Sequence, residues 1–144
     1  MKNKNIIVIF IFIILSMTAC DNSSNSSNEE TKTWEETFAD TSWTAVSSKN
    51  SSTKTYTFND DATEFVSSST GTPEERRNGG LGFAFADNTI NVNNPKSLGH
   101  GTWEFTLDTG NKHRFHVNEN KLQESRWSNG KFVLRPHILY KNSN

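Results

Sequence analysis

Residues 102–117, TWEFTLDTGNKHRFHV, decide the fold of this 144-residue chain. Apolar residues occupy every second position before the turn at 109–111, namely Trp103, Phe105 and Leu107, and polar residues separate them. The alternation resumes after the turn, around Phe115. A period of two is typical of a strand with one buried face, so the stretch predicts a β-hairpin.

The same pattern recurs along most of the chain. Three further pairs of segments show the same alternation of apolar and polar residues, with turn residues between the two members of each pair. They lie at 55–58 and 63–67, at 81–85 and 90–92, and at 122–127 and 132–134. Short strands with turns every few residues are typical of all-β sandwiches and barrels. We therefore expect an all-β fold, a small antiparallel up-and-down barrel of eight or nine strands, because closure protects the strand edges.

A single short helix is expected before the first strand. Thr33 and Glu36 have the spacing of a capping box, and Trp34 and Phe38 then share one face. The helix can therefore cover part of the core.

The first 20 residues have the pattern of an export signal. Lys2 and Lys4 precede ten uninterrupted apolar residues at 6–15, which are too few to span a bilayer. The segment Met-Thr-Ala-Cys at 17–20 resembles the lipobox of bacterial lipoproteins. That resemblance implies cleavage before Cys20, the only cysteine, and diacylglycerol on its sulfur. An ordinary cleaved signal and an uncleaved anchor are the alternatives.

Residues 21–33 contain no apolar side chain, so they predict a flexible tether. The expected organisation is a signal peptide at 1–19, an acylated cysteine and tether at 20–33, and one β-barrel domain at 34–144. With fatty acyl groups such as palmitate on Cys20, the protein would be anchored to a membrane of the bacterial cell envelope, with the leaflet left open.

Four features resemble the lipocalin-like domains of small bacterial lipoproteins: the short helix, Thr-Ser-Trp at 41–43, the hairpin at 56–63 and Gly-Thr-Trp at 101–103. The resemblance implies a barrel that holds a small apolar or amphipathic ligand. It also implies that Arg135 stacks on Trp43, and a solvated arginine at a strand end is the alternative.

Alternation predicts that the aromatic positions of the strands share the interior. The expected pocket consists of Trp43, Tyr56, Phe58, Phe83, Phe85, Trp103, Phe105 and Phe115. These rings either line a hollow pocket or fill the interior.

Charge divides unevenly along the chain. Residues 34–111 carry five basic and eleven acidic side chains, a net charge of −6, whereas residues 112–144 carry seven and two, a net charge of +5. Alternation predicts a positive outward stripe for a partner protein, formed by Lys112, Arg114, His116 and Arg126. The alternative is ion pairing across the hairpin with Glu104 and Asp108.

Catalytic and metal motifs are scarce. His113 and His116 lie three apart on a predicted strand and so point to opposite faces, and no serine lies in a G-x-S-x-G motif. We expect no enzyme, no metal and no cofactor, and no nucleic-acid partner for an exported domain of net charge −1. Two functions remain: a ligand-binding barrel, or a non-enzymatic interaction module with a filled core that contacts an envelope or host protein through its outer face.

Overall fold

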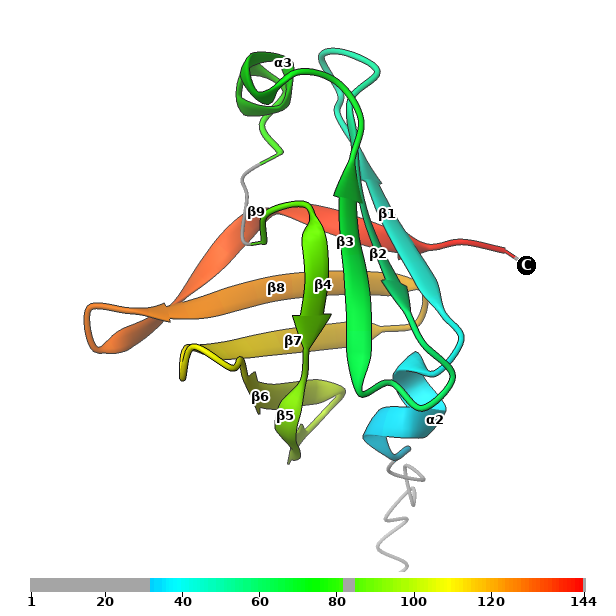
Figure 1. The fold of residues 1–144 in the computed structure, drawn as a ribbon, viewed down its shortest axis with the longest axis vertical. Helices are drawn as coiled ribbons and strands as arrows, with labels where there is room; N and C mark the ends of the chain where they lie inside the picture. The colour runs from blue at the N-terminus through cyan, green and yellow to red at the C-terminus, as the bar shows by residue number, and fades with distance from the viewer. Residues whose placement is uncertain (1–31, 82–84, 144) are drawn as a thin grey trace, which may run out of the picture.

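Nine antiparallel strands of one sheet make up most of the domain (Figure 1). The computed structural model describes residues 32–81 and 85–143; the predicted signal, Cys20 and Phe83 lie outside these ranges. The strands are β1 (Ser42–Val46), β2 (Thr53–Phe58), β3 (Glu64–Ser69), β4 (Asn88–Asn91), β5 (Asn93–Gly99), β6 (Thr102–Thr106), β7 (Lys112–Asn118), β8 (Lys121–Ser128) and β9 (Lys131–Lys141). The all-β prediction is confirmed.

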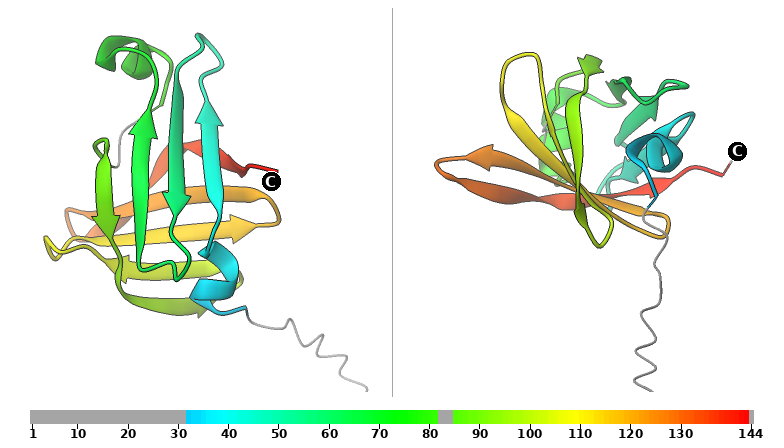
Figure 2. Two further views of the ribbon diagram at one scale, coloured as in Figure 1. Left: turned by 45° about the vertical axis from the view of Figure 1, so that its right-hand side comes forward. Right: turned by 90° about the horizontal axis from the view of Figure 1, so that it is seen from below.

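The strands follow an up-and-down order, β4-β3-β2-β1-β9-β8-β7-β6-β5. Trp43 and Thr44 of the first strand pair with Lys141 and Tyr140 of the last. The predicted closed barrel is nevertheless open at one seam, because β4 and β5 are the two edges of the sheet. Figures 1 and 2 show β1–β4 crossing over β6–β9, so the two halves of the sheet enclose one core.

Asp108, in the turn after β6, links the two open edges. Its carboxylate accepts hydrogen bonds from Asn91 Nδ2 at 2.6 Å and from Asn93 Nδ2 at 2.8 Å. Asn91 ends β4 and Asn93 begins β5. The two amides stabilise the charged carboxylate and lower the pKa of Asp108.

The predicted N-terminal helix is present as α2 (Trp34–Phe38), at the lower end of the molecule in Figure 1. Glu36 N donates to Thr33 Oγ1 at 3.1 Å and Thr33 N donates to Glu36 Oε2 at 2.6 Å, which completes the capping box. Trp34 and Phe38 are buried, and Trp34 Nε1 donates to the Ala62 carbonyl oxygen at 2.8 Å. The helix thus closes one end of the core.

One predicted hairpin is wrong. Leu81 and Phe85 belong to no strand, and a second helix, α3 (Pro73–Asn78), lies ahead of them. The return strand exists as β4, but it pairs with β3 through Phe65↔Ile90 and its neighbours. The hairpins at β2–β3, β6–β7 and β8–β9 are as predicted.

Candidate functional site

All the predicted pocket residues that the structure describes are buried in one core. Phe115 is fully buried, and the centroid of its ring lies 4.8 Å from that of Phe105 and 6.1 Å from that of Tyr56. Phe58 and Phe85 also contact this cluster. Rings at these separations pack against one another, so these five side chains fill this part of the interior.

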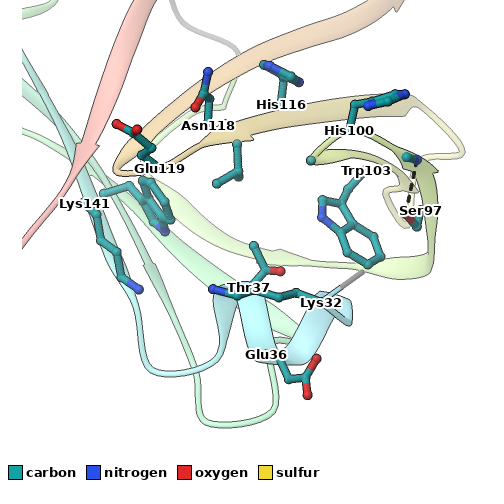
Figure 3. A pocket seen from close by; sticks show the side chains of 14 residues that line it. Lys32, Glu36, Thr37, Ser97, His100, Trp103, His116, Asn118, Glu119 and Lys141 are labelled. Carbon is teal, nitrogen blue, oxygen red and sulfur yellow. Dashed lines mark hydrogen bonds between the residues drawn. The ribbon is translucent and has the colours of Figure 1, made fainter. Parts of the chain in front are cut away.

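The other two described members, Trp43 and Trp103, belong to the same buried core and also line a groove at its end beside α2. The groove has a volume of about 820 Å³ and lies beside α2 (Figure 3). It is lined by Lys32, Glu36, Thr37, Trp43, Ser97, Gly99, His100, Gly101, Trp103, His116, Val117, Asn118, Glu119 and Lys141. Clefts that hold small ligands have volumes of roughly 300–1,000 Å³. The groove is therefore large enough for such a molecule.

The wall opposite α2 is a turn that requires glycine. Gly101 has φ +69°, and a Cβ atom there would collide with the carbonyl oxygen of Val117. Val117 N donates to the Gly101 carbonyl oxygen at 2.8 Å, which holds the turn against β7. His100 precedes Gly101, and Figure 3 shows the indole ring of Trp103 between His100 and Thr37 of α2.

The rim of the groove carries positively and negatively charged side chains. Lys32 and Lys141 provide ammonium groups, and Glu119 provides a carboxylate. Lys141 Nζ lies 5.8 Å from the ring centroid of Trp43, within reach of a cation–π contact. The Glu36 carboxylate is held by the Thr33 amide of the capping box. Indole rings below a charged rim suit a molecule with one apolar and one polar part.

Lys141, rather than Arg135, is therefore the cation beside Trp43. The stacking that the family resemblance implies for Arg135 is wrong, because the C-terminal end of β9 brings Lys141 opposite Trp43 in the sheet register. Arg135 lies six residues earlier on the strand.

The predicted positive stripe forms only in part. Lys112, Arg114 and His116 share the outward face of β7, since Phe115 between them is buried. Arg126 does not join them: it pairs with the inward-facing His113, because the tight β7–β8 turn sets Asn118 opposite Lys121. The prediction that Arg126 belongs to the stripe is wrong.

Ion pairing across the hairpin accounts for the centre of the stripe. Arg114 Nε and Nη2 donate to Glu104 Oε2 at 2.9 and 2.7 Å, and the guanidinium lies 3.7 Å from the ring centroid of Phe132. His116 Nδ1 lies 2.9 Å from Thr102 Oγ1. Asp108, the other expected partner, instead binds Asn91 and Asn93.

Sequence reasoning missed a polar cluster inside the sheet. Glu124 is fully buried, and its carboxylate accepts from Tyr56 Oη at 3.0 Å and lies 3.2 Å from His113 Nδ1. Burial and the nearby Glu124 charge raise the pKa of Tyr56. Lys54 is also buried, and its ammonium contacts Asp87 at 3.1 Å. The sequence did contain a signal for this cluster. Lys54 and Glu124 are charged residues at strand positions that alternation assigns to the buried face.

Comparisons with known proteins add no family. No family model, no curated protein and no solved structure matches the chain. Within residues 32–81 and 85–143, no three His, Cys, Asp or Glu side chains are grouped to hold a metal ion. No helix in the described part of the chain is long and apolar enough to cross a membrane.

Proposed function

We propose that this protein is a lipid-anchored lipoprotein of the bacterial cell envelope whose β domain binds a small amphipathic ligand in the groove beside α2. The observation that carries the proposal is the groove itself, with Trp43 and Trp103 below a rim of charged side chains. Its activity is binding rather than catalysis.

The packed aromatic cluster favours the groove over the centre of the sheet as the ligand site. Phe115 and Phe105 leave only van der Waals separation between their rings, whereas the groove opens to solvent beside Trp103. An apolar group can contact the small part of Trp103 that faces the groove, and a polar head can meet Lys32, Lys141 or Glu119.

Lys32 also relates the groove to the proposed anchor. It lines the groove and stands at the end of the predicted tether, so the groove opens on the side where the tether joins the domain. About a dozen polar residues then separate it from Cys20, an r.m.s. span of roughly 20 Å for a flexible chain. A ligand released from a membrane surface would be within reach.

The groove is tested by filling it. A variant chain starting at Thr31 should bind the amphipathic probe 1-anilinonaphthalene-8-sulfonate at one saturable site, measured by probe fluorescence. Asn118→Trp puts an indole at the groove and should abolish that binding. Lys112→Trp, at the other end of β7, is the matched control and should bind normally. Equal binding by both variants would rule out the groove as the site.

The anchor is tested at Cys20. Intact mass should show loss of residues 1–19 and added acyl mass, and Cys20→Ala should leave the protein unacylated and release the domain from membranes. An unmodified cysteine in the mature protein would refute the anchor.

A second function, contact with another protein, is favoured by the outer face of β8 and β9. Outward side chains on these strands are apolar and exposed: Trp127, Leu134, Ile138 and Tyr140. The occupant that fits them is a second copy, because a two-fold related copy would present the same exposed apolar side chains to this face.

Self-association is tested by one charge. Leu134→Lys should convert a dimer to a monomer in analytical ultracentrifugation of the protein in detergent, and Val66→Lys, an exposed valine on β3, should not. A wild-type monomer at every concentration would exclude self-association through this face.

A further inference from the structure

The irregular pairing of β8 with β9 places two basic side chains inside the sheet. Between the pairs Gln123↔Ile138 and Ser125↔Leu134, β8 advances two residues while β9 advances four. The residues of these two pairs face outward, and side chains alternate between the two faces along a strand. Arg135 and His137 therefore lie on the same inward side as Glu124. His137 is only 6% exposed, which agrees with this placement.

The inward groups of Arg135 and His137 have no hydrogen-bond partner among the described residues. Arg135 Nε and Nη2 and both ring nitrogens of His137 are shielded from solvent and unpaired. Ser67 Oγ, on β3, is in the same state. Buried polar groups in folded proteins almost always have a partner, so Arg135 and His137 indicate an occupant that the protein does not supply.

The buried carboxylate of this cluster is not a partner of Arg135. Each oxygen of Glu124 has one partner, Tyr56 Oη or His113 Nδ1. Asp87 accepts from Lys54 Nζ at 3.1 Å and from Ser69 Oγ at 2.6 Å. Neither carboxylate is hydrogen-bonded to Nε or Nη2 of Arg135.

The unpaired atoms of Arg135 have a particular shape. Nε and Nη2 form one edge of the planar guanidinium, and two parallel N–H groups on that edge match the two oxygens of a carboxylate. We propose that Arg135 and His137 form an interior site for the carboxylate group of a small organic acid. This site is distinct from the groove beside α2, since neither residue lines that groove.

Charge at the site predicts that binding depends on pH. The groups that face His137 are Glu124 on β8, Arg135 on its own strand and Lys54 on β2, with Tyr56 and His113 attached to Glu124. Burial lowers the pKa of His137, so the free ring is neutral at pH 7. A bound carboxylate adds a negative charge, which raises that pKa and draws a proton onto the ring. Binding should therefore strengthen as the pH falls below 7.

The experiment titrates acetate, and separately propionate, into the full-length protein in detergent micelles, with the ring proton signals of the four histidines followed by NMR. The His137 signal should shift saturably, and its pKa should rise with acetate present. Arg135→Gln should weaken binding by about tenfold or more, the usual loss for a charge-assisted hydrogen bond. Arg126→Gln, also on the inward side but exposed, should bind as the wild type does.

Two further measurements keep the test decisive. If Arg135→Gln does not fold, Arg135→Lys keeps the charge but removes the two-pronged edge, and it should still weaken acetate binding. A His137 signal that does not respond to either acid, in a folded protein, would overturn the proposal and leave water as the partner of these groups. A response to phosphate that equals the response to acetate would overturn the assignment to a carboxylate.

Discussion

At the residue scale, the groove depends on two tryptophan side chains and on one backbone contact at Gly101. The Trp103 ring is 7% exposed and Trp43 only 1%, as the alternation of their strands predicted. The sequence drew attention to Gly101 but not to the reason for it, because its requirement comes from the carbonyl oxygen of Val117, sixteen residues away in the sequence. Local patterns locate buried faces, but a contact between a turn and a neighbouring strand depends on the register.

Gly101→Ala is expected to destabilise the protein more than Gly110→Ala does. Both glycines have positive φ, which costs about 1–2 kcal/mol for a residue with a Cβ atom. Only at Gly101 would the new Cβ also meet backbone, whereas no atom lies within 4 Å of it at Gly110. Urea unfolding followed by circular dichroism measures the difference, and equal losses would contradict the contact.

Trp103→Ala should lower the free energy of unfolding by about 3–5 kcal/mol, since it removes a buried ring next to Trp34. Thermal or urea unfolding checks this value. Trp127→Ala, which removes an indole that is 47% exposed, is the control and should cost much less. A similar loss at both positions would place Trp103 outside the core.

At the element scale, the sequence predicted strands with alternating apolar residues and missed those without them. β5 contains Asn-Asn-Pro-Lys-Ser-Leu-Gly, has no buried residue and lies at an edge, where proline is tolerated. α3 buries no side chain either, so no apolar period marks it, although Thr72 and Glu75 form a capping box. Elements that bury nothing leave no hydrophobic signal.

Asp108 should stabilise the contact between the β4 and β5 edges in a pH-dependent way. Its pKa is lowered in the folded state, so its contribution is present above the usual value of 3.8 and is lost as the pH falls through the lowered pKa. Asp108→Ala should reduce the melting temperature at pH 7, and the difference from wild type should shrink toward pH 2. Asp60→Ala, in the β2–β3 turn, is the control. A difference that is constant over this range would refute the assignment.

At the scale of the whole molecule, the all-β class and the up-and-down strand order followed from the sequence, and the open seam did not. Alternation shows which strands exist, whereas closure depends on whether the last edges meet, and here β4 runs into β5 after the single residue Val92. The interior polar cluster was missed for a related reason. Three separate strands supply Tyr56, His113 and Glu124, and only the assembled sheet brings them together.

The domain is expected to fold without its tether. A chain starting at Thr31 keeps α2, every strand and the core, because residues 21–30 contain no apolar side chain to contribute. Its melting temperature should match that of the full chain, and its far-UV spectrum should be dominated by β structure. A predominantly helical spectrum, or a large loss of stability, would contradict this expectation.

The pairing of β1 with β9 has a consequence for how fast the chain reaches its native state. Every other strand pair joins sequence neighbours, so those hairpins can form early and at small cost in chain entropy. The pair Trp43↔Lys141 instead closes a loop that spans nearly the whole domain. We expect this closure to come after the transition state, so that substitutions on the β1–β9 ladder accelerate unfolding while those in the β6–β7 hairpin slow refolding.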